Sequence, residues 1–426
     1  MANGPLNGIR VLEFGQIIAA PMACQFLSDL GATVIKVEPP EGEPWRFNAP
    51  FLPGETKSFQ ELNHGKQSIA IDLTAPAGRE AIHRLVKTVD VVAINYRPDI
   101  AKRLCIDYES LAAIRPDLIY ADSTAFGRQG DMADRPGYDI VVQAAAGLLG
   151  SSGFVNARGV PGVPPPSIAD TTTAYAITTG VCAALFHRAM TGQGQKVETS
   201  LLINAMAIQV GGSWSLMSVP AGDAALKARL VEVHAQARTE GLSYAELVAL
   251  RDDALRPGRG NIYYRCYETS DGLIAIAALS PSLRAKVRAA LQVEHSMDEP
   301  GYNPRDPKQR ARDEALTAAV EAKVRGQSTA YWERAFAEGG VPVSPVNFAH
   351  DLMEHPQVQA NDYVVELDHE LSGPYRVTAP PWKMSVTPPE PQGASPRLGR
   401  DTAALLASAG YSDEQIAAMK REGVVA

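Results

Sequence analysis

The chain has 426 residues, of which 45% are hydrophobic and 21% charged, and its formal net charge is −8. This composition is typical of a soluble globular enzyme with more than one domain, and it excludes extensive disorder. The acidic balance argues against a general nucleic-acid binder, because such proteins contact phosphates with clustered lysine and arginine. It leaves room for a local basic pocket that binds a phosphorylated cofactor.

Targeting and metal-binding signals are lacking in the sequence. The N-terminus has no basic region followed by an apolar region, and the apolar stretches are too short to span a bilayer. The four cysteines form no C-x-x-C pair, and the eight histidines follow no metal-ligand spacing. We therefore expect a cytoplasmic protein without a metal, a disulfide framework, a nucleic-acid partner or a membrane partner.

The first part of the chain alternates short apolar strands with helices. Strands are predicted at 9–14, 33–37, 68–73, 91–95 and 118–123, with helices after the first strand and at 76–89 and 108–114. This alternation predicts a doubly wound α/β domain with parallel strands. No G-x-G-x-x-G follows the first strand, which disfavours a dinucleotide-dependent dehydrogenase.

Two loops after strands are candidates for ligand binding. In open α/β sheets, ligands bind beyond the carboxyl ends of the strands. This rule draws attention to Gln16-Ile17-Ile18 after the first strand and to Asn95-Tyr96-Arg97-Pro98 after a later one.

The later part of the chain predicts a second, smaller domain and a return segment. We expect a helix at 138–149, a strand at 196–199, and a helix-prone linker at about 222–256. A hairpin over 262–268 and 273–278 and helices at 281–292 and 308–324 indicate a small α+β domain. Beyond 341 the chain becomes proline-rich and irregular, with an extended segment at 380–383, before two C-terminal helices of which Ser412 caps the second.

Asp170 ends a proline run and begins a small-residue helix, within Pro164–Tyr175. Its position is that of a helix N-cap, and Gly192 follows the helix as a stop signal. Unpaired amides and the helix dipole would favour the ionised carboxylate, which would make Asp170 a ready acceptor or nucleophile. The simpler interpretation is that Asp170 only caps the helix.

Six further segments, in this order along the chain, resemble the family III CoA-transferases, which include formyl-CoA and carnitine CoA-transferases. The segments are Pro5–Phe14, Leu30–Glu38, Asp90–Pro98, Arg135–Asp139, Gly192–Gln195 and Leu398–Asp401 with Gly410–Ser412. Each motif alone is weak, but together they run from residue 5 to the C-terminus. The chain is therefore identified as a member of that family.

The resemblance implies that Asp170 is the covalent nucleophile of a CoA-transferase. It would attack an acyl-CoA thioester to give a mixed anhydride and CoA thiolate, which would then form an aspartyl-CoA thioester. An acceptor carboxylate would complete the exchange without ATP or a metal. The substrates would be small acyl-CoA and carboxylate molecules, with succinyl-CoA or another dicarboxyl-CoA as a donor suggested by the family.

The resemblance also implies a set of residues that bind coenzyme A. They are Ile17, Ile18, Ile71, Asn95, Tyr96, Arg97, Arg103 and Tyr138. Guanidinium groups suit the phosphate end of CoA because they stay charged and bind in a bidentate way. The simpler interpretation of Arg97 and Arg103 is solvated surface charge, but the family context favours CoA. Pro39 and Thr74 stand where formyl-CoA transferase has an arginine and a lysine, and its glycine-rich loop is at best echoed by Pro257–Gly260. We therefore do not expect a formyl-CoA transferase.

Two alternatives share these motifs. The α-methylacyl-CoA racemases of the same fold use a His-Asp acid–base pair, but Tyr138 occupies the position of their histidine, and a phenol is a poor base near neutral pH. A non-catalytic acyl-CoA-binding protein would keep the CoA loops and lose the nucleophile, so the presence of Asp170 counts against it.

By resemblance, the large domain is Rossmann-like and formed by both chain ends. Its N-terminal part would span 1–220, followed by a linker at 221–256, the small α+β domain at 257–345 and the returning part of the large domain at 346–426. Two such chains would thread through each other as an interlocked homodimer.

Overall fold

The computed structural model describes residues 4–163, 165–210, 220–255, 261–304 and 306–426. The chain divides into two compact units. The first consists of Met1–Phe154, Gly162–Trp214 and Pro356–Ala426, so it contains both chain ends. The second consists of Val155–Pro161 and Ser215–His355.

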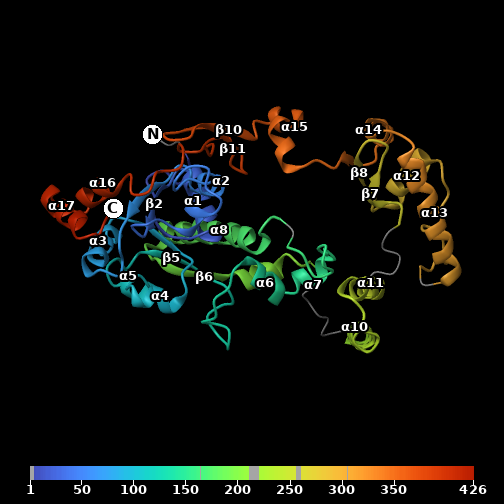
Figure 1. Cartoon of the computed structure of the whole chain (residues 1–426), viewed down its shortest axis with the longest axis horizontal. Helices are drawn as coiled ribbons and strands as arrows, with labels where there is room; N and C mark the ends of the chain where they lie inside the picture. The colour runs from blue at the N-terminus through green and yellow to red at the C-terminus, as the bar shows by residue number, and fades with distance from the viewer. Residues whose placement is uncertain (1–3, 164, 211–219, 256–260, 305) are drawn as a thin grey trace. The chain divides into compact units, whose positions relative to one another are not determined.

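The first unit is built on a six-stranded parallel sheet (Figure 1). Its strands are β1 (Arg10–Phe14), β2 (Thr33–Glu38), β3 (Gln67–Ala70), β4 (Val91–Ile94), β5 (Ile119–Thr124) and β6 (Gln195–Ser200). They lie in the order β3-β2-β1-β4-β5-β6, so the direction of winding reverses between β1 and β4. This topology confirms the predicted doubly wound α/β sheet.

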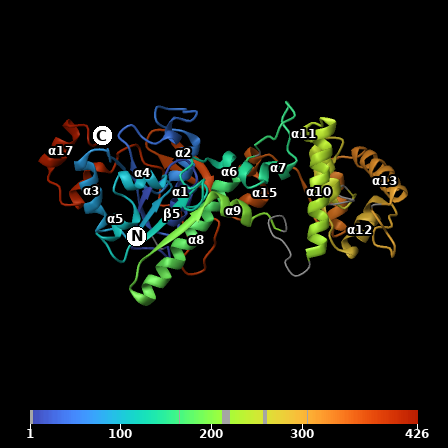
Figure 2. The same cartoon turned by 90° about the horizontal axis from the view of Figure 1, so that it is seen from below.

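Helices cover both faces of this sheet because successive strand side chains point to opposite sides. Leu12 and Phe14 belong to a core with α3 (Pro76–Val86), α4 (Pro98–Arg103), α5 (Tyr108–Ala112), α16 (Thr402–Ser408) and α17 (Asp413–Arg421). Val11 faces the opposite core, with α1 (Ala19–Asp29) and the long α8 (Ile168–Thr191), which Figure 2 shows beside the sheet. The near-continuous apolar strands are therefore buried on both faces.

The C-terminal segment completes the free edge of the sheet at β3. Asp401 and Thr402 accept hydrogen bonds from the backbone amides of Ser68 and Ala70, at 2.8 and 3.1 Å. Ile71 forms an isolated antiparallel bridge with Val425. In Figure 1 the red helices α16 and α17 accordingly lie beside the blue α3.

Shorter elements complete the first unit. They are η1 (Pro44–Phe47), α2 (Lys57–Asn63), α6 (Asp139–Ala145), α7 (Leu148–Ser152), α9 (Leu201–Ala207), α15 (Pro356–Gln359), β10 (Val364–His369) and β11 (Gly373–Thr378). The helix predicted at 138–149 is wrong as a single element, because Gly147 adopts a left-handed φ of 82° between α6 and α7. The β10–β11 hairpin was not predicted, and 380–383 is irregular.

The second unit has its own core. Its elements are α10 (Pro220–Glu240), α11 (Tyr244–Leu255), β7 (Tyr264–Glu268), β8 (Leu273–Ala277), α12 (Pro281–Leu291), α13 (Pro307–Arg325), α14 (Thr329–Glu338), β9 (Val343–Pro345) and η2 (Ala349–Glu354). The hairpin β7–β8 and helices α12 and α13 match the predicted elements, whereas α14 was not predicted. The stretch interpreted as a linker, 221–256, largely forms α10 and α11, which fall in this unit.

Among the residues described, none of the helices combines the length and the apolar character needed to cross a bilayer.

Candidate active site

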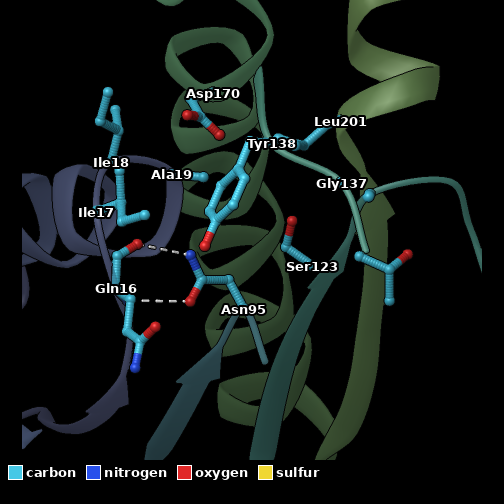
Figure 3. A pocket seen from close by; sticks show the side chains of 12 residues that line it. Gln16, Ile17, Ile18, Ala19, Asn95, Ser123, Gly137, Tyr138, Asp170 and Leu201 are labelled. Carbon is cyan, nitrogen blue, oxygen red and sulfur yellow. Dashed lines mark hydrogen bonds between the residues drawn. The ribbon is translucent and has the colours of Figure 1, made fainter. Parts of the chain in front are cut away.

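A pocket opens where the strand order of the sheet reverses (Figure 3). Its walls come from the loops after β1, β4 and β5 and from the starts of α6, α8 and α9. The lining residues are Gln16, Ile17, Ile18, Ala19, Asn95, Ser123, Thr124, Ala125, Gly137, Tyr138, Asp170 and Leu201. The hollow measures about 90 Å³, far below the ~300–1,000 Å³ of a pocket that encloses a whole ligand. It therefore has room for the reacting end of a substrate only.

Asp170 lies in the first turn of α8 rather than at its N-cap. The helix begins at Ile168 and its N-cap is Ser167, so the predicted N-cap position is wrong by three residues. The reason is that a different carboxylate caps this helix: Asp139 Oδ1 accepts hydrogen bonds from the Ala169 and Asp170 amides at 2.9 and 3.1 Å. The stop signal at the other end is confirmed, because Gly192 is the left-handed C-cap with a φ of 76°.

The carboxyl group of Asp170 is consequently harder to ionise than the sequence suggested. Burial, and secondarily the negative charge of Asp139, raise the pKa of Asp170 from 3.8 to about 7. The expectation that its helix position favours the carboxylate is wrong, because Asp139 accepts the hydrogen bonds of the first amides of α8 and adds a like charge. At neutral pH, Asp170 is therefore divided between its acid and its carboxylate.

The loop after β1 is held against the loop after β4 by a reciprocal pair of hydrogen bonds. Asn95 Oδ1 accepts from the Gln16 amide at 3.0 Å, and Asn95 Nδ2 donates to the Gln16 carbonyl at 2.9 Å. Figure 3 draws both bonds at the floor of the pocket. Asn95 thus orders the adjacent residues Ile17 and Ile18, which line the pocket.

Tyr138 projects into the pocket from the start of α6. It is the N-cap residue of that helix and stays 65% exposed. Figure 3 shows its ring beside Asp170 and directed toward Asn95. Its phenol group therefore lies inside the pocket, on the side of Asn95.

The structure brings together five of the nine residues predicted for the site: Ile17, Ile18, Asn95, Tyr138 and Asp170. The other four are not among the described residues that line this pocket. Ile71 is 1% exposed within the core beside Val425. Arg97 is exposed and pairs with Asp99 at 2.9 Å, and Arg103 is exposed at the end of α4. Tyr96 is half-buried, and burial raises its pKa to about 12. Their contact with CoA stays a prediction.

Sequence reasoning missed Asp139 and Ser123. Asp139 is buried and also accepts from Gln143 Nε2 at 2.5 Å. The sequence feature that could have identified Asp139 is its position in Gly137-Tyr138-Asp139, directly after the predicted site residue Tyr138. Ser123 is a strand residue without any pattern of its own. Pro164 and the glycine-containing loop 257–260 lie outside the described residues.

Comparison with known proteins places the chain in a family. The model of CoA-transferase family III matches residues 6–402. Succinate–glutarate CoA-transferase of Agrobacterium fabrum is 33% identical over 416 residues, which cover 95% of each chain. Human succinyl-CoA:glutarate CoA-transferase is 28% identical, over 99% of this chain and 90% of the human one.

Solved structures agree with the sequence matches. Crystal structures of Rv3272 from Mycobacterium tuberculosis match with a TM-score of 0.73 and 26% identity, over 94% of this chain and 99% of that one. A CaiB/BaiF family protein from Brucella suis matches with a TM-score of 0.72 and 29% identity, over 96% of this chain and 100% of that one. The chain therefore belongs to CoA-transferase family III and is an acyl-CoA:carboxylate CoA-transferase.

Proposed function

We propose that this enzyme transfers CoA from an acyl-CoA thioester to a free carboxylic acid through covalent intermediates on Asp170. The observation that carries the proposal is the position of the Asp170 carboxylate in the pocket at the carboxyl edge of the sheet. A carboxylate that reacts covalently must reach the thioester carbon, and the neighbouring residues leave this side of Asp170 open to the pocket.

The high pKa of Asp170, about 7, suits this chemistry. A cysteine thiol, the nearest model for the CoA thiol, has a pKa of about 8.5, and an ordinary aspartate has a pKa of about 3.9. An ordinary carboxylate would therefore be a much better leaving group than the thiolate it must displace. Burial brings the two basicities closer, so that attack on the thioester becomes less unfavourable while about half of Asp170 is still ionised at pH 7.

The exchange proceeds in four balanced steps. An Asp170 carboxylate oxygen attacks the thioester carbon, the C–S bond breaks, and CoA leaves as the thiolate. The thiolate attacks Asp170 Cγ and releases the donor acid as a carboxylate, which leaves an aspartyl-CoA thioester. The acceptor carboxylate then attacks Cγ and expels the thiolate, which finally attacks the acceptor carbonyl and regenerates Asp170. Amide and phenol donors near the pocket, including Tyr138, would stabilise the oxyanions of these steps.

The substrate class is proposed from the relatives. Two of them are named for succinate or succinyl-CoA with glutarate. We infer that the acids are short dicarboxylates. CoA would lie over the loops of Ile17, Ile18, Asn95 and Tyr96, with Arg97 and Arg103 toward its phosphates and Ile71 near its path. We further propose that two chains interlock as a homodimer, and that the enzyme acts in the cytoplasm, where CoA thioesters are made and used.

The test is to map the covalent adduct. The enzyme is incubated with succinyl-, glutaryl- or acetyl-CoA, trapped with hydroxylamine or borohydride, digested and analysed by mass spectrometry. We expect a modification on Asp170, and neither adduct nor CoA transfer in Asp170→Ala. Asp131→Asn, which changes an exposed carboxylate in the same unit, is the control and should behave as the wild type.

Two results would contradict the proposal. An adduct on another residue would show that Asp170 is not the nucleophile. An unmodified Asp170 together with exchange of the α-proton of a 2-methylacyl-CoA for deuterium would favour the racemase alternative.

A further inference from the structure

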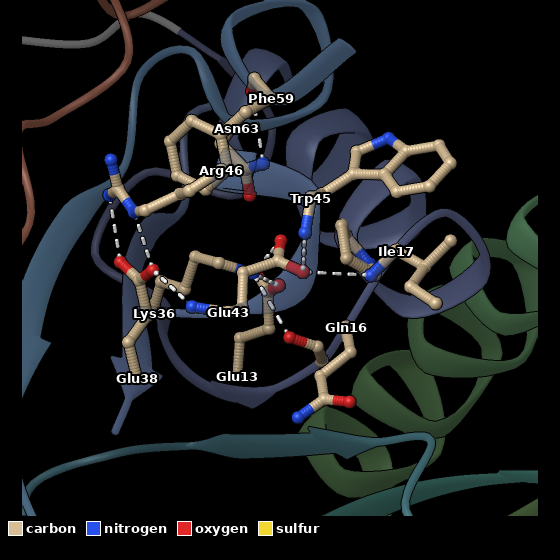
Figure 4. A network of polar contacts seen from close by, with 12 residues as sticks. Glu13, Gln16, Ile17, Lys36, Glu38, Glu43, Trp45, Arg46, Phe59 and Asn63 are labelled. Atoms are coloured by element: carbon tan, nitrogen blue, oxygen red, sulfur yellow. Dashed lines mark hydrogen bonds and ion pairs between the residues drawn. The ribbon is translucent and has the colours of Figure 1, made fainter. Parts of the chain in front are cut away.

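Behind the pocket lies a buried network of charged side chains between β1, β2, η1 and α2 (Figure 4). Lys36 Nζ is 2.9 Å from Glu13 Oε1 and 3.3 Å from Glu43 Oε1. Lys66 pairs with Glu13 at 2.7 Å, and Arg46 pairs with Glu38 at 2.7 Å. These side chains are almost fully buried. Although burial alone lowers the pKa of Lys36, the Glu13 and Glu43 carboxylates raise it above its usual range, so the ammonium stays charged.

This network is hydrogen-bonded to residues 15–18, which we call the first loop. Lys36 Nζ donates to the Gly15 carbonyl at 3.0 Å. Glu43 Oε2 accepts from the Ile17 amide at 3.1 Å and from the Trp45 amide at 3.2 Å. The buried Lys36–Glu43 ion pair therefore holds the backbone on both sides of Gln16, while Asn95 holds Gln16 itself.

The first loop requires these hydrogen bonds because the backbone of Ile17 is strained. Its φ is 69°, in the left-handed region. A β-branched side chain is a rare occupant of that region, where glycine or asparagine would fit without strain. Such a conformation persists only where the surroundings over-determine it. Here the surroundings are the Glu43 carboxylate and the Asn95 amide, and the strained residue lines the pocket.

We propose that Glu43 is a positioning residue of the active site: it holds Ile17 in the left-handed conformation, so that the first loop presents Ile17 and Ile18 to the acyl-CoA. This inference rests on the proposed function. Glu43 is 1% exposed, does not line the pocket, and contacts the first loop through the Ile17 amide. Asp170 is held by other contacts, from Asp139 and α8, so loss of Glu43 should affect substrate binding more than the chemical step.

The test compares KM and kcat for the acyl-CoA in the wild type and five variants. We expect Glu43→Ala to raise KM about tenfold while kcat changes less than threefold. Glu43→Gln keeps a side-chain oxygen that can accept both amides, and its KM should stay within threefold of the wild type. Ile17→Gly accepts a positive φ without strain, so Glu43→Ala should raise KM less than threefold when it is introduced into Ile17→Gly. Glu55→Gln, which changes a buried carboxylate of the same region that contacts Arg46 and Gln60, is the matched control and should keep the wild-type KM.

The inference is overturned if Glu43→Ala leaves KM unchanged, or raises it equally in the wild-type and Ile17→Gly backgrounds. Should Glu43→Ala fail to fold, Ile17→Pro replaces it. Proline fixes φ near −65° and has no amide hydrogen, so it removes the proposed conformation without altering a buried charge. An unchanged KM in Ile17→Pro would equally overturn the inference.

Failure of the proposed function would look different. In that case the wild type would show neither an Asp170 adduct nor CoA transfer. The same variants would then be titrated with CoA by calorimetry, and the Kd should change by the same factors if Glu43 positions the loop.

Discussion

Replacing Asp170 with asparagine should stabilise the protein while abolishing its activity. Because burial and Asp139 raise the pKa of Asp170 from 3.8 to about 7, the native protein holds the Asp170 proton more tightly than the unfolded chain does. Stability therefore falls as the pH rises above 4 and reaches its lower plateau above pH 7. With a pKa of 3.8 in the unfolded chain and about 7 in the native protein, the ionisation of Asp170 destabilises the native state by about 2 kcal/mol at pH 5 and by about 4 kcal/mol at pH 8. Asparagine has a similar shape and no charge to bury, so it should relieve most of this destabilisation.

The assay is chemical denaturation of the wild type and Asp170→Asn in parallel at pH 5 and pH 8. The advantage of the variant should grow by about 2–3 kcal/mol between the two pH values. Asp131→Asn, at an exposed site, should show no comparable growth. An advantage that is the same at both pH values, or that shrinks as the pH rises, would refute the claim that Asp170 is a destabilised buried carboxyl group.

Three further predictions concern the surroundings of the pocket and the sheet. Asp139→Asn removes a like charge but keeps an oxygen for the α8 amides. We therefore expect the half-maximal pH for trapping the Asp170 adduct to lie near 7 in the wild type and to fall in the variant. An unchanged profile would contradict the role of the Asp139 charge. Asn95→Ala removes both hydrogen bonds to Gln16. Because each bond contributes ~0.5–1.5 kcal/mol, the KM for acyl-CoA should rise by about tenfold in steady-state kinetics. A KM within twofold of the wild type would count against this prediction. Gly194→Ala should lower the thermal unfolding midpoint more than Gly192→Ala. A Cβ at Gly194 would lie 2.2 Å from the Asp117 carbonyl carbon, whereas a Cβ at Gly192 meets no atom and costs only the strain of its positive φ. Equal midpoints would contradict this steric argument.

The alternation of strands and helices in the first unit could be predicted because its signals are local and strong. Each buried strand is a short apolar run, and Gly31 separates the first helix from β2 at the expected place. The hairpin of β10 and β11 could not be predicted, because Pro374 and alternating polar residues hide it and its pairing partner is its only support. The break between α6 and α7 occurs at one glycine, Gly147, with a left-handed φ, and a single glycine inside an apolar run does not by itself signal the end of a helix.

Five of the nine residues predicted for the site line the pocket, but the electrostatics of the pocket could not be predicted. Strand ends pointed to Asn95 and the first loop, and the family motif pointed to Asp170. The pKa of Asp170 could not be inferred, because it depends on burial and, secondarily, on a carboxylate 31 positions away that occupies the start of the same helix. The strain at Ile17 was equally hidden, since an isoleucine does not signal a positive φ and Glu43 lies 26 positions beyond it.

The closure of β3 by the C-terminal segment has a consequence for how the protein is made. Ser68 is separated from its partner Asp401 by 333 positions. At a synthesis rate of ~5–20 residues per second, roughly 15 to 70 seconds pass between the emergence of the two. During this interval the nascent sheet presents a bare edge of the kind that pairs with other chains. We therefore expect this edge to stay shielded or only partly folded until Asp401 and Thr402 have been synthesised.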